Sequence, residues 1–223
     1  MQQYSKAGLA VAALLLGASA SAQVAGTFSV RAGFTHIAPQ VRSGDLSAPS
    51  FPGTKIDVGN ATSLSGGVNY MLTNHWAVDV PLALPFKHEI EGDGAIAGVG
   101  KLGETKVLPV TVFAQYRFAE PEARFRPYVG LGLTYSRFFK TRTTATLSGL
   151  TGGTPSRPTT ASVDNKWGLT PQVGFVWNFN ERWSLDAAYY KSFLKTTTHL
   201  SSGQSISKRL NPDVIAIGVA YRF

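Results

Sequence analysis

The sequence contains no cysteine, and this absence excludes a disulfide framework, thiolate chemistry and any metal site built on cysteine. Beyond residue 22 it also lacks a run of about 18 uninterrupted apolar residues, so no membrane-spanning helix is expected there. Acidic residues are scarce, with 13 against 21 lysines and arginines, and the formal net charge is +8. The chain of 223 residues has a length that suits one domain.

The first 22 residues predict a secretory signal peptide. Lys6 supplies a positive charge, Ala7 to Ala18 form a short apolar core, and Ala20 to Ala22 make a small-residue cleavage site. A buried N-terminal helix is the alternative, but the pattern favours cleavage after Ala22 and a mature domain at residues 23–223. An exported basic protein is expected to meet anionic lipid phosphates, and nucleic acid is not expected as its partner.

Eight segments alternate between apolar and polar residues with the period of two that is typical of β-strands. They cover residues 27–34, 62–72, 75–86, 107–118, 126–135, 167–179, 183–193 and 213–223. Their lengths are close to the 9–11 residues that a tilted membrane strand requires. A soluble β-sandwich also alternates, so the connections between the segments are needed to separate the two folds.

The connections alternate in length. Short turns follow the even segments, at Thr73 to His75, Ala119 to Ala123 and Asn180 to Arg182. Long polar loops follow the odd segments, roughly at Pro39 to Asn60, Lys87 to Lys106, Arg137 to Lys166 and Leu194 to Arg209. Short turns at one end and long loops at the other are typical of outer-membrane barrels. The sequence therefore predicts an all-β fold, an eight-stranded antiparallel up-and-down transmembrane β-barrel.

Aromatic residues gather at the ends of the apolar faces, where an amphipathic ring suits the headgroup level of a bilayer. Those near the short turns are Tyr70, Trp76, Tyr116, Phe118, Trp177, Phe179, Trp183, Tyr221 and Phe223, and those near the long loops are Phe86, Tyr135 and Trp167. Phe223 is expected to end the closing strand in the periplasmic girdle and to be the residue that the barrel-assembly machinery binds.

Prolines 81, 85, 109, 127, 171 and 212 lie inside or at the edges of these segments. Proline cannot donate a hydrogen bond to a strand ladder, so we expect them at bulges or strand starts.

Several stretches resemble the OmpW family of Gram-negative outer-membrane proteins. They are "VRAGF" from Val30, "LPFKH" from Leu84, "LPVTVFAQYRF" from Leu108, "FRPYVGLGLTY" from Phe125, "KWGLTPQVGFVWNFNERW" from Lys166 and the closing "LNPDVIAIGVAYRF". The resemblance covers nearly all of the mature chain. It implies a porin-like barrel with a narrow apolar bore that passes small hydrophobic molecules, which leave sideways into the bilayer.

The inward-facing phase of the strands predicts an ionic floor near the periplasmic end. Its members are Arg31, Asp79, Arg117, Arg126 and Asp186. Eight strands leave room only for side chains or one small ligand, so paired Asp and Arg groups are expected to close the bottom of the bore. The alternative is that these charges satisfy one another purely as a structural core.

Above the floor, the inward-facing residues are small or apolar, including Gly132 and Val176. Pro81, Phe113 and Tyr190 are the larger side chains near mid-height and are our candidates for contact with a bound solute. Plain space-filling is the competing interpretation of these three side chains.

An enzyme, a metal site and a cofactor are not expected. The four histidines are scattered, and His88 beside Glu89 is poorly placed for catalysis because adjacent strand residues point to opposite faces. The acidic stretch from Lys87 to Gly94 is better explained as a solvated loop than as metal ligands.

The outer loops are basic, and their lysines and arginines are candidates for pairing with the phosphates of lipopolysaccharide. They are Arg137, Lys140, Arg142, Arg157 and Lys166 in the third loop and Lys195, Lys208 and Arg209 in the fourth. This pattern leaves a second functional hypothesis open, a non-transporting structural or surface-interaction barrel whose loops bind lipopolysaccharide or other partners.

Overall fold

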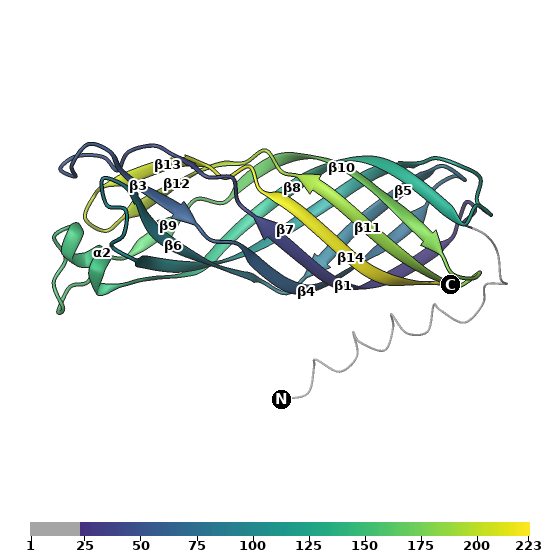
Figure 1. Cartoon of the computed structure of the whole chain (residues 1–223), viewed down its shortest axis with the longest axis horizontal. Coiled ribbons are helices and arrows are strands. Elements are labelled where there is room, and N and C mark those ends of the chain that lie inside the picture. Colours follow the sequence, from purple (N-terminus) through teal and green to yellow (C-terminus); the bar gives the residue numbers. More distant parts are fainter. Residues whose placement is uncertain (1–22) are drawn as a thin grey trace, which may run out of the picture.

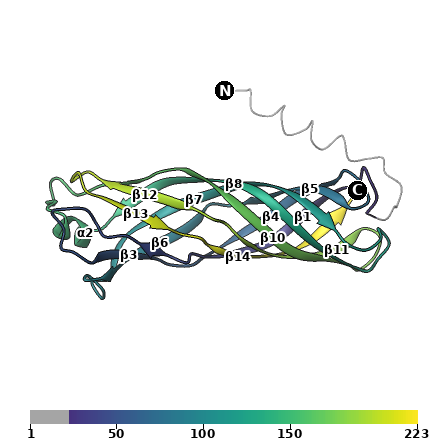
Figure 2. The ribbon, with the colours of Figure 1, turned by 90° about the horizontal axis from the view of Figure 1, so that it is seen from above.

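The structure is a computed structural model that describes residues 23–223, so the predicted signal peptide lies outside the described residues. The chain forms a long tube of antiparallel strands, which both side views show (Figures 1 and 2). The elements are β1 Phe28–Ala38, β2 Arg42–Ser43, β3 Thr54–Val58, β4 Ala61–Met71, β5 Trp76–Ala83, β6 Phe86–Gly94, β7 Lys101–Arg117, β8 Phe125–Thr143, α2 Ala145–Leu150, β9 Ala161–Val163, β10 Lys166–Asn178, β11 Trp183–Lys191, β12 Lys195–Leu200, β13 Ser205–Arg209 and β14 Asp213–Arg222.

The barrel closes through hydrogen-bonded neighbours in the ring order β7-β5-β4-β1-β14-β11-β10-β8, with β8 returning to β7. The predicted eight-stranded antiparallel barrel is therefore confirmed. The first and last strands pair from Ser29↔Arg222 to Ala38↔Asp213. At their centre Gly33 faces Gly218, and a Cβ on Gly33 would lie 2.4 Å from the Gly218 Cα, so close approach requires glycine there.

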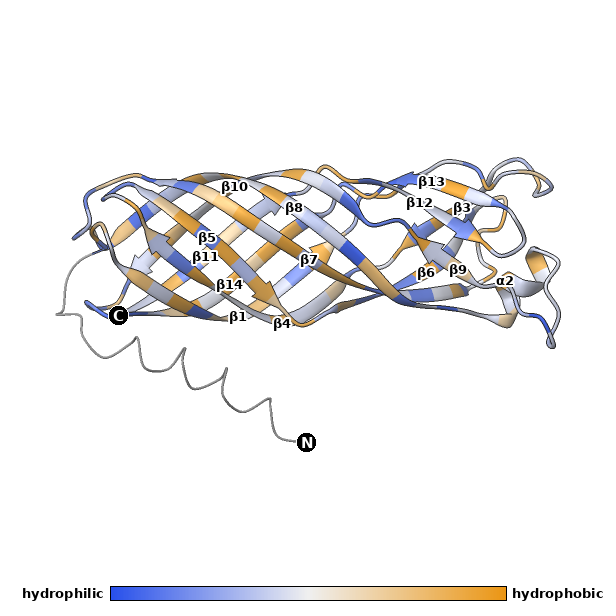
Figure 3. Cartoon of the chain, turned by 180° about the vertical axis from the view of Figure 1, so that it is seen from behind, coloured by the Kyte–Doolittle hydropathy of each residue, from blue (hydrophilic) through white to orange (hydrophobic). Residues whose placement is uncertain are grey.

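The outward face of the barrel is apolar. Figure 3 shows hydrophobic segments recurring along β7, β10 and β14. Phe34 and Ile215, for example, are each 59 % exposed in the isolated chain, as expected for side chains that contact lipid. Among residues 23–223, no helix has the length and apolar character needed to cross a membrane.

The predicted short turns are confirmed, and they lie at the end of the tube that carries the C-terminus (Figure 1). Aromatic side chains meet one another at this end. The ring centroids of Trp183 and Tyr221 lie 4.9 Å apart, and those of Tyr221 and Phe223 lie 5.0 Å apart. At the other end of the lipid-facing band, Tyr135 and Trp167 pack at 4.9 Å. Two aromatic girdles thus bound the apolar band.

The long segments between barrel strands are not simple loops. Strands β6, β7 and β8 continue beyond the outer girdle, and β3 pairs with β6. A second sheet with the order β2-β13-β12-β9 completes an extension at the end opposite the C-terminus (Figure 1). The expectation of polar loops is wrong for these stretches, because β-pairing satisfies their backbone groups and their inner face is buried.

Phe86 was expected in the outer aromatic girdle, and this expectation is wrong. Leu82 and Leu84 face outward, but Phe86 is only 1 % exposed and faces the bore. Pro85 separates β5 from β6, and the alternation shifts by one residue there. A single extra residue in a strand sends every following side chain to the opposite face.

Candidate binding cavity

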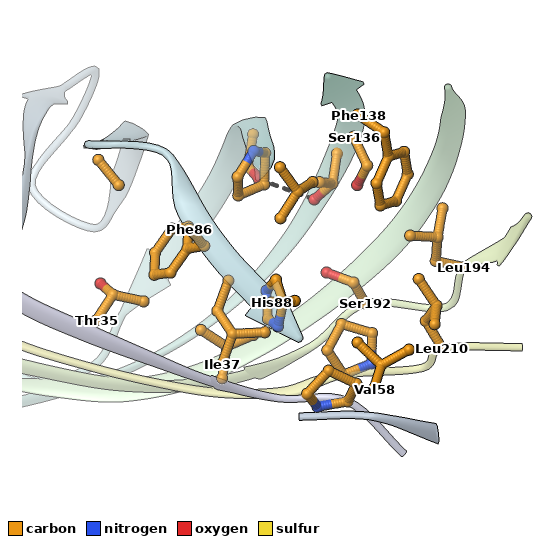
Figure 4. A pocket seen from close by; sticks show the side chains of 18 of the residues that line it. Thr35, Ile37, Val58, Phe86, His88, Ser136, Phe138, Ser192, Leu194 and Leu210 are labelled. Atoms are coloured by element: carbon orange, nitrogen blue, oxygen red, sulfur yellow. Dashed lines mark hydrogen bonds between the residues drawn. The ribbon is translucent and has the colours of Figure 1, made fainter. Parts of the chain in front are cut away.

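A cavity lies inside the tube where the barrel meets the extension, and we call it the bore cavity. Its free volume is about 80 Å³. Figure 4 shows Phe86 and His88 of β6, Phe138 of β8 and Leu194, which precedes β12, pointing into it. Most of the other lining groups are aliphatic side chains, prolines, threonines and serines, and no Asp or Glu lines it. The bore cavity therefore suits a small apolar molecule.

The hydroxyl groups along one wall of the bore cavity satisfy one another. Thr111 and Thr134 are joined by a hydrogen bond of 2.8 Å, Thr134 and Thr170 by one of 2.7 Å, and Thr170 and Ser192 by one of 2.9 Å. Buried hydroxyls that are already bonded offer little to a solute beyond their methyl groups. The wall is thus less polar than its composition indicates.

Two aromatic rings close the bore cavity from below. Phe113, which is fully buried, and Tyr190, which lines the cavity, meet edge to face with centroids 5.5 Å apart. The ring of Phe113 lies against Gly132, where an added Cβ would come within 2.5 Å of a ring carbon. Gly132 therefore leaves space for Phe113 and does not line the cavity itself.

Beneath these rings, Arg31 bridges the two acidic residues of the ionic floor. Its Nη2 lies 3.2 Å from the Asp79 Oδ2, and its Nη1 lies 3.1 Å from the Asp186 Oδ1. The Tyr128 hydroxyl donates to the same Asp186 oxygen at 3.2 Å. Both carboxylates are buried, so each needs this cation to compensate for the loss of water.

Arg117 and Arg126 are buried in the floor but pair with neutral groups. Both donate to the Gln23 Oε1, at 2.6 Å and 3.0 Å, and Arg126 also donates to the Asn74 carbonyl at 2.6 Å. The structure thus brings together all five residues of the predicted floor. Of its three arginines, Arg31 is the one that forms ion pairs with Asp79 and Asp186. A cavity lined by floor residues of the described barrel has a free volume of about 10 Å³, barely large enough for a single water.

Of the five predicted solute contacts, Pro81 and Tyr190 line the bore cavity. Phe113 lies directly beneath it, and Gly132 lies behind Phe113. The expected height of Val176 is wrong, because the strand register places it opposite Arg126 on one side and Asp186 on the other. It lies only two residues before the end of β10 at the periplasmic turn.

The barrel wall is interrupted beside the bore cavity. Strand β5 pairs with β7 only from Trp76↔Tyr116 to Asp79↔Phe113, and pairing resumes at Phe86↔Val107. Six residues on one side therefore oppose five on the other, which is the one-residue excess of a bulge. In the described structure no ladder pair joins the stretch 80–85 to the stretch 108–112, and we call this unpaired region the seam.

Three prolines account for the seam. Pro81 and Pro85 lie on one side and Pro109 on the other, and none has an N–H to donate across it. Leu82 is 55 % exposed on the outer surface and also lines the bore cavity. The bore cavity therefore adjoins the seam, with Leu82 between the cavity and the lipid-facing surface.

A second cavity, which we call the vestibule, lies in the extension and has a free volume of about 380 Å³. Leu102, Leu147, Leu200 and Ile206 are among its apolar lining residues. Ile90 and Lys208 line both the vestibule and the bore cavity, so they lie where the two adjoin.

Two buried titratable groups line these cavities and were not predicted as site residues. The His88 Nδ1 lies 2.7 Å from the Gly59 carbonyl, and burial lowers the pKa of His88 below its ordinary value. Lys208 was expected among the lipopolysaccharide-facing cations, but it is 3 % exposed and faces inward, and burial lowers its pKa to about 8. A signal for Lys208 was its place in the strand alternation with Ile206 and Leu210.

The acidic stretch from Lys87 to Gly94 forms β6, not a solvated loop. His88 faces inward while Glu89 faces outward and pairs with Lys101 at 2.7 Å, which agrees with the expected opposite orientation. In residues 23–223 no group of three or more histidines and carboxylates has an arrangement that could hold a metal ion.

Comparisons with known proteins agree with this architecture. The family model described as "OmpW family" matches residues 24–223. Outer membrane protein W of Vibrio cholerae serotype O1 is 35 % identical over 220 residues, covering 97 % of each chain. The crystal structure of the outer membrane protein OprG from Pseudomonas aeruginosa superposes with a TM-score of 0.81 and 28 % identity, covering 91 % of this chain and 99 % of OprG. A more distant relative, the dibenzothiophene metabolism operon protein PahQ of Pseudomonas aeruginosa, is 23 % identical over 80 % of this chain and 79 % of its own.

Proposed function

The chain belongs to the OmpW family of outer-membrane β-barrels, and from this membership and the shape of its interior we propose that it facilitates the uptake of small hydrophobic molecules. A molecule would enter from the vestibule, occupy the bore cavity and leave through the seam into the bilayer. No covalent chemistry is part of this function.

The observation that carries the proposal is the position of the seam relative to the ionic floor. The bore cavity is apolar and adjoins the seam at Leu82, whereas the path straight down meets Phe113 and then the buried charges around Arg31. An apolar molecule gains nothing by entering a site of hydrogen-bonded charges, and it is stabilised on entering lipid. Sideways exit is therefore the favourable route.

The name of the relative PahQ supports a hydrophobic substrate, since its operon is named for the metabolism of dibenzothiophene. We propose the same substrate class, a small apolar molecule, for this chain. The threonine hydroxyls along the wall of the bore cavity bond to one another, so this wall does not select between apolar molecules by hydrogen bonding.

Filling the bore cavity is expected to stop uptake. Ser136 is buried and lines the cavity, so Ser136→Phe would place a ring in the free space. Uptake of a radiolabelled aromatic hydrocarbon by proteoliposomes should fall to the rate of protein-free liposomes.

The matched control is Leu133→Trp, on the lipid face of the same strand, where Leu133 is 52 % exposed. It adds a larger ring without filling the cavity and should leave uptake unchanged. Equal uptake by wild type and Ser136→Phe would contradict transport through the cavity. No uptake by the wild type would favour the structural barrel.

The extension also supports the predicted lipopolysaccharide contact. In the strand register, Lys195 of β12 lies opposite Arg209 of β13, and Arg209 lies opposite Arg42 of β2. Three exposed cations therefore form a row. Like charges directly opposite on a sheet repel unless an anion lies between them. Lys195 follows two residues after Phe193, which is 50 % exposed, so the row lies just outside the apolar band at the level of lipid phosphates.

We expect lipopolysaccharide to raise the thermal unfolding midpoint of the wild type more than that of the triple variant Arg42→Gln, Lys195→Gln, Arg209→Gln. Each cation near an anionic surface contributes about 1 kcal/mol. A control triple, Lys55→Gln, Arg124→Gln and Arg182→Gln, removes the same charge elsewhere and should respond like the wild type. Equal stabilisation of all three proteins would rule out a specific contribution from the row.

The partner proposed for the C-terminal end is the barrel-assembly machinery. Phe223 packs its ring against Phe28 at 6.2 Å and Tyr221 at 5.0 Å, and its N–H bonds to the Phe28 carbonyl. The contacts with Phe28 form only once the first and last strands have met, so Phe223 is free to bind the machinery before closure.

A further inference from the structure

Lys208 is a buried cation inside an otherwise apolar wall. It lies on the inward-facing row of β13 and the residues that follow, between Ile206 and Leu210, which are 3 % and 7 % exposed. The side chain of Lys208 itself is as buried as these two neighbours. A lysine in such a position loses its hydration and needs a compensating group.

The compensation visible in the structure is small. The Lys208 Nζ donates to the Thr198 hydroxyl at 2.8 Å. In the described residues, no carboxylate lies within ion-pair distance of it, and burial is the one cause of its lowered pKa, with no charged group contributing. An ammonium has three donors, so hydrogen-bonding capacity remains for an anion.

The position of Lys208 coincides with the route proposed above. It and Ile90 are the two residues of the described chain that line both the vestibule and the bore cavity. A molecule moving from one cavity to the other must pass this pair. On both sides of it the walls are apolar, with Leu200 and Ile206 outward and Leu194 and Leu210 inward.

The charges that face this route are of one sign. Arg142 lines the vestibule and Lys208 lies at the junction. No Asp or Glu lines either cavity. Such a path repels cations, and only a negative group compensates the buried ammonium.

We propose that the transported molecules include apolar compounds with a single carboxylate, and that Lys208 binds this carboxylate as the apolar part moves from the vestibule into the bore cavity. This inference rests on the proposed uptake function and narrows its substrate class. The single apolar chain of such a compound fits the narrow bore cavity. The ion pair between its carboxylate and Lys208 offsets the loss of water from both groups. A neutral apolar molecule gains no such contact.

The test compares two probes that differ only at the head, octanoate and octanol, in the full barrel. We expect Lys208→Met to lower octanoate uptake by proteoliposomes about tenfold, which corresponds to about 1.4 kcal/mol, and to leave octanol uptake unchanged. Lys208→Arg keeps the charge and should retain most octanoate uptake. Lys140→Met, at an exposed position of the extension, is the matched control and should behave like the wild type.

Binding of octanoate to the detergent-purified chain, measured by titration calorimetry, separates the two hypotheses. Weaker octanoate binding in Lys208→Met, without uptake by the wild type, would overturn the transport function and keep the carboxylate site. Uptake of both probes at unchanged rates in Lys208→Met would overturn the site and keep transport. Methionine matches the length of the lysine stem and removes a buried charge, and an unchanged heat-dependent gel shift would show that the variant is folded.

Discussion

Cross-linking the two sides of the seam is expected to abolish uptake of an apolar molecule and to leave the barrel folded. Extending the register of Asp79↔Phe113 by three residues places Leu82 opposite Val110. Both side chains face outward and are about half exposed, at 55 % and 46 %. Cysteines at these two positions, joined by a short reversible thiol reagent, would therefore bridge the proposed exit.

The physical reason is that the seam is the part of the wall without ladder hydrogen bonds beside the bore cavity. Opening it costs no backbone pairing, whereas opening any paired neighbour would leave N–H and C=O groups unsatisfied in hydrocarbon. A covalent bridge removes this freedom. Uptake should fall to the rate of protein-free liposomes and return when the reagent is reduced.

The control is the pair Leu133→Cys and Leu169→Cys. These residues are partners in the continuous ladder between β8 and β10 and are both 52 % exposed. Cross-linking them changes neither the seam nor the bore cavity, so uptake should persist. Because the natural chain contains no cysteine, each reagent reacts only at the introduced pair. Uptake that survives the 82–110 bridge would show that molecules leave by another route.

The architecture of the barrel could be predicted from the sequence because it depends on period and length. Strand alternation fixes which side chains reach lipid, and the short turns at residues 73–75, 119–123 and 180–182 fix the strand order. The inward phase then placed Arg31, Asp79 and Asp186 on one level, where the structure joins them. These inferences need no knowledge of side-chain packing.

The bore cavity could be predicted only in part, because its walls depend on a break in that period. The extra residue near Pro85 turns Phe86 and His88 inward, and the alternation on either side of it does not reveal the shift. Lys208 was assigned to a solvated loop since cations are rarely buried. Its burial follows from the pairing of β13 with β12, which joins residues outside the eight predicted strands.

The largest effect on stability is expected from Arg31→Met. Arg31 is the cation that lies within 3.2 Å of both Asp79 and Asp186, and its removal leaves two buried carboxylates without their partner. Breaking a buried ion pair from one side costs about 3–5 kcal/mol, out of the roughly 5–15 kcal/mol that stabilises a typical domain. Urea unfolding in lipid vesicles, followed by the fluorescence of the tryptophans in the girdles, should show a free energy of unfolding that is lower by this amount.

A matched control separates burial from ion pairing as such. The Lys191 Nζ lies 2.7 Å from the Asp213 Oδ1, which is shorter than either ion pair of Arg31. The side chains of Lys191 and Asp213 are, however, both about one-third exposed. Lys191→Met should therefore cost no more than about 1 kcal/mol, since water screens and replaces such a pair. Equal losses in the two variants would contradict the view that burial makes the Arg31 bridge strong.

The triple variant Arg31→Met, Asp79→Asn, Asp186→Asn tests what the ionic floor does beyond holding the barrel together. Removing both carboxylates with the arginine eliminates the unpaired charges, so most of the lost stability should return. Because the seam lies above the floor, uptake of an apolar hydrocarbon by this triple variant should match that of the wild type. Uptake lost in a variant that has regained its stability would mean that the floor takes part in transport, and that molecules travel deeper than the seam.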